Sequence, residues 1–437
     1  MATSIEARRN PPFRAEHLGS LLRTGELLQK RAALDEGMAV AADLKPLEDR
    51  DIKEIVDLQL TLGYRAITDG EYRRHSVFSS NLQGNPYTAT LQLISILVFW
   101  GAFWPGLEGM TEIKNPALDI FRPYLPDIAA FTETGHKPGE SVICTGKIKH
   151  IGSTYLGEFG YLKSLVPADQ VKYLKLTLPA PNWYHLRYKE GRAYPKDVYA
   201  SDEEYFQDIS KAYQAELQIL YDVGLRNVQI DDPNLACEAR QIDKRRIDFC
   251  SEKMLAGWEA DTSNKYSADE LFEAYIKLYN DCISKRPADM HVGVHLCRGN
   301  FVNSRHFSEG GYDRIAARLF KELNVDTFYL EYDTPRAGGF EPLVHLPKHK
   351  NVILGVITSK FPDLENLSEM KARVMKAAEF IADGNRESVE EALNRMGVSP
   401  QCGFASHSSG NAIDRDGMVA KLKLVRQLAD SIWPGQP

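Results

Sequence analysis

Short apolar runs recur along the chain, and each is followed by polar residues or by Gly and Pro. Eight of them have the length of buried strands, at 13–20, 64–71, 173–181, 226–233, 290–297, 326–333, 351–359 and 398–406. Longer stretches with apolar residues at helical spacing separate several of these runs, at 46–63, 203–224, 268–286 and 369–384. Strands that alternate with helices favour a parallel sheet, and eight such units predict an α/β fold of the (β/α)8 TIM-barrel class.

The pattern indicates a single barrel domain over residues 1–437, with an N-terminal arm and an insertion after the second strand. A chain of this length can also hold two or three domains, but a barrel with insertions reaches it as one. A further run at 141–152 predicts an additional hairpin. The insertion, at 79–98, has little amphipathic pattern. It is interpreted either as a lid over the barrel mouth or as an unspliced intron in the gene sequence.

The apolar stretch at 91–107 is the one candidate for a membrane span in the sequence. It is slightly short for a span and contains Gly and Pro, so a buried or lid-forming segment is favoured and no membrane partner is expected. Its aromatic part, from Phe99 to Trp104, is a candidate contact for a homodimer.

Composition narrows the class of protein. The net charge is -7 and the basic residues cluster only at 243–246, so nucleic acid is not expected as a partner. The N-terminus lacks the apolar stretch of a secretory signal. Six cysteines in 437 residues are too few and too scattered for a disulfide framework. They fit a cytoplasmic protein whose cysteines bind metal or do chemistry.

Chemically active side chains collect where the predicted strands end. In a parallel barrel the C-terminal ends of the strands surround the active site. The side chains at these ends are acids, thiols, imidazoles and other polar groups, and packing alone would not require them: His17, Ser20, Asp69, Glu71, Asp231, Asp232, His295, Cys297, Glu331, Asp333, Thr358, Lys360 and Cys402.

Four of these residues form a candidate metal site. His295 and Cys297 are two positions apart on one strand, so their side chains point to the same face. With Glu331 and Cys402 they offer one nitrogen, one oxygen and two sulfur ligands, which suits tetrahedral zinc and disfavours magnesium and calcium. Copper(I) and iron stay open on ligand type alone. The alternative is that the histidine and the cysteines are ordinary core residues.

Several segments together resemble the catalytic barrel of cobalamin-independent methionine synthase. In chain order they are EHLGSLLR, TDGEYRR, VQIDDPNLA, HLCRGN, FYLEYD and SPQCGFAS. The resemblance implies a zinc ion held by His295, Cys297, Glu331 and Cys402. It also implies a transferase that activates a thiol, homocysteine or a similar one, as a zinc thiolate. The thiolate would attack a methyl or alkyl donor, for which a folate is one candidate.

The same resemblance implies roles for residues at the other strand ends. Glu71 and Asp231 would bind the amino group of homocysteine, and Asp231 is also a candidate catalytic residue. Gly19 and Ser20 would hold the carboxylate of the thiol substrate. For the acidic pair that includes Asp231, a helix N-cap after a strand is the alternative role.

Two aromatic residues each have two candidate roles. Trp183 lies where the family places a Trp near the pterin ring of its donor, so it could stack on an aromatic donor or simply pack. His17 could contact substrate or close the bottom of the barrel.

Three departures from the family put the methyl donor in question. Lys360 stands where the family has a proton-donating His; a lysine could protonate a leaving group or pair with an acidic donor. The acidic segment reads IDDP instead of IDEP, and the chain is too short to include the family's N-terminal half. Shorter relatives such as epoxyalkane–coenzyme M transferases share the Lys, which leaves a non-folate electrophile open.

Two other functions are kept as alternatives. One is a metal-free decarboxylase or lyase that resembles uroporphyrinogen decarboxylase, which would need anion-binding arginines at the barrel mouth. Its candidates are Arg14, Arg23, Arg73 and Arg298. The other is a non-catalytic protein that stores zinc or a thiol, for which a closed metal site would be expected.

Overall fold

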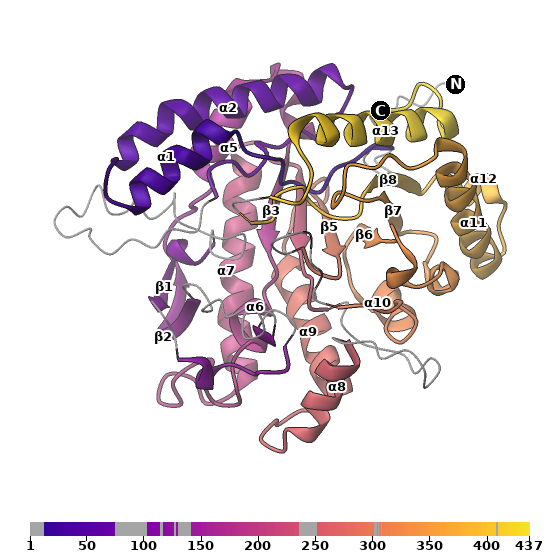
Figure 1. The fold of residues 1–437 in the computed structure, drawn as a ribbon. Helices are drawn as coiled ribbons and strands as arrows, with labels where there is room; N and C mark the ends of the chain where they lie inside the picture. The colour runs from indigo at the N-terminus through magenta and orange to yellow at the C-terminus, as the bar shows by residue number, and fades with distance from the viewer. Residues whose placement is uncertain are drawn as a thin grey trace.

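A parallel sheet forms the centre of the molecule. The computed structural model describes residues 13–74, 103–113, 117–125, 128–129, 141–235, 251–300, 304, 306, 308–407 and 410–437. Within these ranges the sheet follows chain order: β3 (Lys175–Pro179), β4 (Asn227–Asp231), β5 (His291–Leu296), β6 (Thr327–Glu331), β7 (Asn351–Ile357) and β8 (Met396–Pro400) (Figure 1). Every neighbouring pair is parallel. The C-terminal ends of the strands therefore lie at one end of the sheet.

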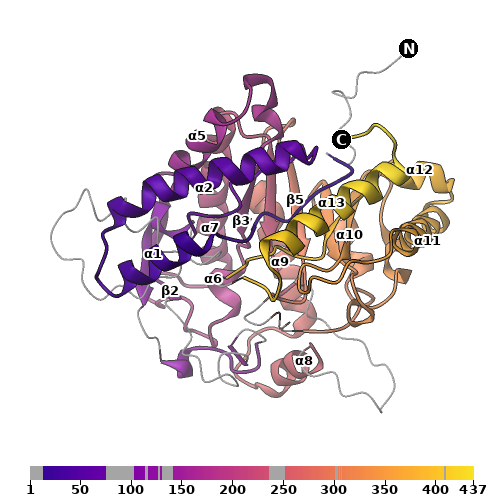
Figure 2. The same cartoon turned by 45° about the horizontal axis from the view of Figure 1, so that its top comes forward.

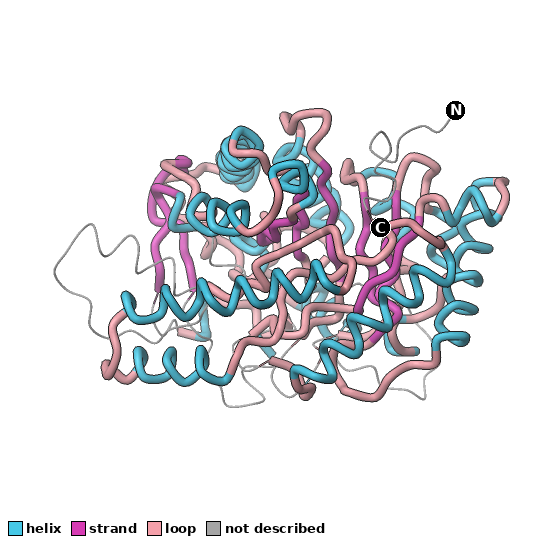
Figure 3. The backbone as a smooth tube through the Cα atoms, turned by 90° about the horizontal axis from the view of Figure 1, so that it is seen from above, coloured by secondary structure: helices cyan, strands magenta, loops and turns pink. Residues whose placement is uncertain are grey.

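Helices lie on several sides of this sheet, as the view from above shows (Figure 3). The first two, α1 and α2, lie side by side near the C-terminal helix α13 (Figure 2). The α-helices are α1 (Gly25–Asp35), α2 (Ala41–Thr61), α5 (Leu156–Ser164), α6 (Trp183–Leu186), α7 (Asp202–Asp222), α8 (Ser251–Ala260), α9 (Ala268–Ile283), α10 (Ala316–Glu322), α11 (Leu367–Asn385), α12 (Val389–Leu393) and α13 (Arg415–Ile432). Short 3-10 helices are η2 (Trp104–Gly106), η3 (Leu118–Ile120), η4 (Ala168–Tyr173), η6 (Pro335–Ala337) and η7 (Glu341–His345).

Several of the long helices begin where the sequence supplies a capping side chain. Ser201 precedes α7, and its hydroxyl accepts a hydrogen bond from the backbone N–H of Glu204. Ser267 and Glu270 form a reciprocal capping box at the start of α9. Such caps satisfy backbone donors that have no partner inside the helix. The four helices predicted from apolar spacing correspond to α2, α7, α9 and α11.

Six of the eight predicted strands are confirmed as β3 to β8, and the first two are not regular strands. The segment at 13–20 makes a single parallel bridge, from Ala15 to Val398 in β8. At the other edge of the sheet, the carbonyl of Ile67 accepts a hydrogen bond of 2.9 Å from the N–H of Lys175 in β3. Both segments therefore lie beside the outer strands, where a barrel would place its first two strands.

Left-handed backbone ends the extended path of each of these two segments. Gly19, Gly70 and Glu71 have φ angles of 98°, 69° and 60°. An extended strand needs a negative φ, so each of these residues turns the chain away from a ladder. The predicted α/β class is confirmed, and the arrangement is TIM-barrel-like.

The predicted hairpin at 141–152 was wrong. This segment is one strand, β2 (Ser141–His150), and its antiparallel partner is β1 (Leu107–Ile113), which lies earlier in the chain. The two strands form a separate small sheet. The register shifts between Glu108 and Met110, where Gly109 has a φ of 83°.

Other predictions fall partly or wholly outside the described ranges. The insertion at 79–98 and the basic cluster at 243–246 lie outside them. In the proposed homodimer segment, Phe103 and Trp104 are described and both are buried. The centroid of the Phe103 ring lies 4.4 Å from that of Tyr213. Phe103 and Trp104 therefore belong to the hydrophobic core. Among the described helices, none combines the length and apolar character that a membrane crossing requires.

Candidate metal and substrate site

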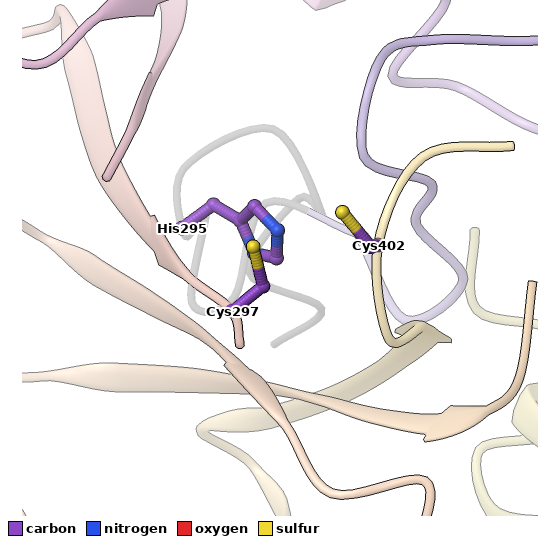
Figure 4. Close-up of side chains that lie close together, drawn as sticks. All are labelled: His295, Cys297 and Cys402. Atoms are coloured by element: carbon purple, nitrogen blue, oxygen red, sulfur yellow. The ribbon is translucent and has the colours of Figure 1, made fainter. Parts of the chain in front are cut away.

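Three side chains from two strand ends form a compact group of metal-ligand type. His295 lies in β5, Cys297 follows that strand directly, and Cys402 lies two residues beyond β8. Their ligand atoms all lie within 4.8 Å of one another, and all three residues are buried. Figure 4 shows the two sulfur atoms and the imidazole ring turned toward a common centre. The structure thus brings three of the four predicted ligands together.

The hydrogen bonds of His295 leave one ring nitrogen available to this group. Its Nδ1 lies 3.3 Å from the carbonyl oxygen of Tyr329, which assigns the proton to Nδ1. Its Nε2 is buried and has no hydrogen-bond partner among the described residues. A metal-ligating histidine usually donates its other ring N–H in this way.

The surroundings of Cys297 and Cys402 shift the pKa values of their thiols in opposite directions. The hydrogen bond with Cys297, and then the neighbouring His295, hold the pKa of Cys402 well below its usual value although burial acts in the opposite direction. The same hydrogen bond and burial raise the pKa of Cys297. An imidazole nitrogen beside two thiols is a donor set that fits zinc.

Glu331, the fourth predicted ligand, lies at the end of β6 but outside the three-residue group. Its Oε2 accepts a hydrogen bond of 2.7 Å from the backbone N–H of Arg298, and its Oε1 pairs with the guanidinium of Arg336. Burial favours the protonated form, yet the charges of Arg336 and then Arg298 lower the pKa of Glu331. A bound metal would either leave this ion pair intact, with an open fourth position, or displace Arg336 from the carboxylate.

The two acids of the segment IDDP have different surroundings. Asp232 accepts hydrogen bonds from the backbone N–H groups of Asn234 and Leu235, at 2.9 and 3.0 Å, and so holds the turn that follows β4. Asp231 ends β4 and stands opposite His295 in the register of β5. Burial raises the pKa of Asp231 to about 7. A buried carboxylate with a raised pKa beside a metal-ligand group is typical of a functional site.

Glu71 holds its carboxylate in place through a backbone conformation that is rare for a residue with a side chain. Its φ is 60°. Its Oε1 accepts a hydrogen bond of 2.7 Å from the hydroxyl of Thr177 and lies 3.2 Å from the guanidinium of Arg74. Non-glycine residues in this region are enriched at binding sites, where the surrounding structure compensates the strain.

Gly19 allows the chain to pass close to Glu71, and we expect Gly19→Ala to disrupt the site. A Cβ atom there would lie 2.5 Å from Oε1 of Glu71 and 2.8 Å from Cγ2 of Thr177, at a φ of 98°. The left-handed backbone alone should lower the free energy of unfolding by about 1–2 kcal/mol, and displacement of Glu71 should weaken binding of homocysteine, the thiol that the resemblance implies.

Gly25→Ala is the matched control for this prediction. Gly25 begins α1, and its Cβ would meet nothing within 4 Å. In urea denaturation, the free energy of unfolding of Gly25→Ala should equal that of wild type or slightly exceed it. Titration calorimetry should show unchanged homocysteine binding. Wild-type stability and affinity in Gly19→Ala would contradict the prediction.

Ser20 and His17 are both engaged by the protein itself. The Ser20 hydroxyl lies 3.4 Å from the N–H of Ala405, so it contacts the loop that carries Cys402. His17 Nε2 lies 2.8 Å from Oε1 of Gln59 on α2. Burial, and then the charge of Lys175, lower the pKa of His17 to about 3, so its ring is neutral. These contacts favour a packing role for His17.

Trp183 and Lys360 are buried near other strand ends. Trp183 begins α6, and the guanidinium of Arg187 lies 5.7 Å from its ring centroid. Lys360 follows β7, and its Nζ lies 3.2 Å from the carbonyl of Gly299 and 3.1 Å from Oδ1 of Asn300. Burial lowers the pKa of Lys360. Its ammonium group thus faces the loop that follows Cys297.

The arginines that a lyase would need already donate to groups of the protein. Each points its guanidinium at backbone carbonyls or at carboxylates and amides of neighbouring elements. The four are Arg14, Arg23, Arg73 and Arg298. Arg23 in particular donates to the carbonyls of Glu71, Arg74 and Ala405 and thereby links two mouth loops. The arginines therefore have structural roles, which weakens the metal-free alternative.

Sequence reasoning missed Arg336 and Asn300, which contact the predicted site residues. Arg336 lies five positions after Glu331, and Asn300 lies three positions after Cys297. Both act through contacts that depend on the paths of loops, and a single sequence carries no periodic signal for such paths.

Comparison with known proteins agrees with the resemblance seen in the sequence. No family model matches the chain. The chain is 33% identical over 428 residues to the uncharacterized protein YxjG of Bacillus subtilis (strain 168), covering 98% of this chain and 96% of YxjG. A protein from Listeria monocytogenes, solved as a proposed vitamin-B12-independent methionine synthase, is 25% identical with a TM-score of 0.62, covering 97% and 98% of the two chains. The chain therefore belongs to the same family as YxjG, and its resemblance to cobalamin-independent methionine synthases is confirmed.

Two further matches extend this result. YxjH of the same Bacillus strain is 31% identical over 429 residues, covering 98% of this chain and 97% of YxjH. A B12-independent methionine synthase from Shewanella sp. W3-18-1 is 14% identical with a TM-score of 0.59 and covers 96% of this chain and 97% of its own, which supports the fold. The resemblance to these enzymes supports an enzyme of the transferase class.

Proposed function

We propose that this protein is a zinc-dependent thiol alkyltransferase that transfers a methyl or alkyl group from a small-molecule donor to homocysteine or a similar thiol. The observation that carries the proposal is the buried group of His295, Cys297 and Cys402, whose ligand atoms lie within 4.8 Å of one another. Storage of zinc alone would not account for the acidic side chains of Glu71 and Asp231 at neighbouring strand ends.

His295, Cys297 and Cys402 would hold the zinc ion, with Glu331 as a fourth ligand or with that position open to the substrate. When bound there, zinc would supply ionisation of the substrate thiol at neutral pH while leaving its sulfur nucleophilic. An open fourth position beside three protein ligands is typical of catalytic zinc, whereas structural sites are closed.

The protein's own side chains would bind and orient the thiol substrate. Asp231 lies opposite His295 in the sheet register, so an ammonium group bound to this carboxylate would lie near the metal ligands. Glu71 would provide a second carboxylate, and Gly19 and Ser20 would hold the substrate carboxylate. Burial of these groups excludes water and strengthens each ionic contact.

Lys360 would protonate the leaving group of the donor. We expect Lys360→Gln to lower kcat about 100-fold or more, because general acid catalysis contributes at least that factor. The amide of Gln can still donate to Oδ1 of Asn300, so zinc content and the KM for the thiol should change little. Steady-state kinetics together with metal analysis check this, and a wild-type kcat in the variant would exclude a catalytic role.

One assay tests both the thiol alkyltransferase activity and the chemical class of the methyl or alkyl donor. Purified zinc-loaded protein is incubated with homocysteine and, in turn, a methylated folate or an epoxide, and mass spectrometry follows the thiol product. A methylated product supports a folate-type donor, for which Trp183 is the candidate stacking residue. An alkylated product from the epoxide supports the non-folate alternative that Lys360 raises. Absence of any thioether product from an enlarged donor panel would contradict the proposal.

A cytoplasmic location is proposed on the state of the cysteines. Cys144, Cys282, Cys297 and Cys402 are all free thiols in the structure. A reducing compartment keeps such thiols available to metal.

A further inference from the structure

The His295–Cys297–Cys402 group is built from two strand ends that are not neighbours in the sheet. His295 and Cys297 belong to the end of β5, whereas Cys402 follows β8. Two other strands, β6 and β7, lie between them in the sheet order. Backbone ladders pair only neighbouring strands directly, so contacts between the loops add to the sheet in setting the distance from Cys402 to Cys297.

Asn300 makes these contacts. It lies three residues after Cys297, and its side chain is buried. Its Nδ2 donates hydrogen bonds to the carbonyl of Gly403, at 2.8 Å, and to the hydroxyl of Ser406, at 3.0 Å. Gly403 follows Cys402 directly, and the Ser406 hydroxyl lies 3.8 Å from the Cys402 sulfur. One amide thus reaches the backbone next to this cysteine and the hydroxyl beside its sulfur.

The acceptor end of the same amide is used as well. Oδ1 of Asn300 accepts a hydrogen bond of 3.1 Å from Nζ of Lys360, which follows β7. The carbonyl of Lys360 in turn accepts a hydrogen bond of 2.7 Å from the hydroxyl of Ser304. Asn300 therefore joins the loops after β5, β7 and β8, and it needs both a donor and an acceptor to do so.

Two other side chains donate hydrogen bonds to the Gly403 carbonyl and can be compared with Asn300. Oγ of Ser359 and Nδ2 of Asn411 also donate to it, at 2.9 and 3.3 Å. Ser359 belongs to the loop after β7 and Asn411 to the loop that carries Gly403. Of these three donors, Asn300 alone belongs to the loop that carries Cys297. The Gly403 backbone also passes close to Ser20, because a Cβ at Gly403 would clash with the Ser20 hydroxyl.

We propose that Asn300 is a positioning residue, which holds the loop after β8 so that the Cys402 thiol meets His295 and Cys297. The proposal rests on the proposed function in so far as these three residues bind metal. Its geometric content, the approach of two thiols, stands without metal.

The first test measures the binding of Co²⁺, as a spectroscopic substitute for zinc, to the full-length protein. Asn300→Asp keeps an acceptor for Lys360 but loses both donors, and a carboxylate would face the Gly403 carbonyl. We expect this variant to bind Co²⁺ about 10- to 100-fold more weakly than wild type, as loss of an outer contact of a metal ligand typically does. Its thiolate-to-cobalt charge-transfer band should weaken per bound ion, because one thiolate no longer reaches the metal.

Ser359→Ala is the matched control, since it removes a donor to the same carbonyl but leaves the link between the Cys297 and Cys402 loops. It should retain the wild-type band and an affinity within a few-fold of wild type. Equal loss in Ser359→Ala and Asn300→Asp would overturn the specific role of Asn300, as would an unchanged band in Asn300→Asp.

The second test needs no metal, and it separates the positioning role of Asn300 from metal binding by His295, Cys297 and Cys402. Dibromobimane bridges two thiols only when they are close, and mass spectrometry identifies a Cys297–Cys402 bridge. Metal-free wild type and Ser359→Ala should form the bridge, and Asn300→Asp and the uncharged Asn300→Ser should form it several-fold more slowly while keeping a cooperative thermal transition. Equal bridging in all four proteins would overturn the inference. Bridging as expected together with a wild type that binds no Co²⁺ would instead overturn the proposed metal function and leave the positioning role.

Discussion

Replacement of Cys402 by alanine is expected to abolish both metal binding and transferase activity. Only three described ligand-type side chains meet at the site, and Cys402 is the only one of them that does not come from the end of β5. Loss of one of three ligands leaves His295 and Cys297, which cannot hold zinc against water at micromolar concentrations. Metal analysis should give less than about a tenth of the wild-type zinc content. Cys297→Ala should behave in the same way.

Cys282→Ala is the matched control for these substitutions. Cys282 is also fully buried, but it lies in α9 and its sulfur contacts the hydroxyl of Ser210 at 3.9 Å. Its loss should lower stability slightly through a small cavity and should leave zinc content and activity unchanged. Retention of stoichiometric zinc in Cys402→Ala would show that this thiol is a core residue.

Replacement of Asp231 by asparagine is expected to stabilise the metal-free protein at pH 8 and to weaken substrate binding. Burial raises the pKa of Asp231 from 3.8 to about 7. The folded state therefore binds this proton more tightly than the unfolded state, and the contribution of Asp231 to stability falls as the pH rises from about 4 to about 7. The amide introduced by Asp231→Asn carries no charge, so the variant should avoid up to about 4 kcal/mol of this loss.

The same substitution removes the charged partner of the substrate ammonium group. Homocysteine affinity should fall about 10- to 100-fold, as expected for a charge-assisted hydrogen bond. Urea denaturation at pH 5 and pH 8 and titration calorimetry measure the two effects. A stability difference that does not grow with pH, or an unchanged affinity, would contradict the assignment of Asp231.

Asp232→Asn should show the opposite pattern and serves as the control. One oxygen of Asp232 accepts from Asn234 and Leu235, and the other accepts from Asn182 and Tyr279. An amide must present its NH2 group to one of these sets of donors. The variant should therefore be less stable than wild type and keep its affinity for homocysteine.

The sequence predicts strands well where each strand carries its own signal. β7 is a nearly continuous apolar run, and β5 alternates apolar residues with His and Gly; both strands are buried and lie within the predicted ranges. The alternation of strand residues also placed His295 and Cys297 on one face. By contrast, the segments at 13–20 and 64–71 have apolar residues typical of strands, but Gly19, Gly70 and Glu71 turn the backbone left-handed.

The candidate site could be predicted as a set of residues but not as a set of contacts. Strand order brought His295, Cys297 and Cys402 to one end of the sheet. The pairing of Glu331 with Arg336, and the amide of Asn300 between two loops, depend on where loops fold back. A single sequence gives no spacing rule for contacts of this kind, so the ion pair of Glu331 and the contacts of Asn300 came only from the structure.

The central claim is that the His295–Cys297–Cys402 group binds a zinc ion that takes up the thiol substrate. The most direct test is metal analysis of the purified protein combined with zinc-edge X-ray absorption before and after addition of homocysteine. The account predicts one zinc per chain, with nitrogen and sulfur ligands, that gains a sulfur ligand when the thiol is added. A fully folded protein that takes up no zinc, or a zinc whose ligands do not change with homocysteine, would contradict it.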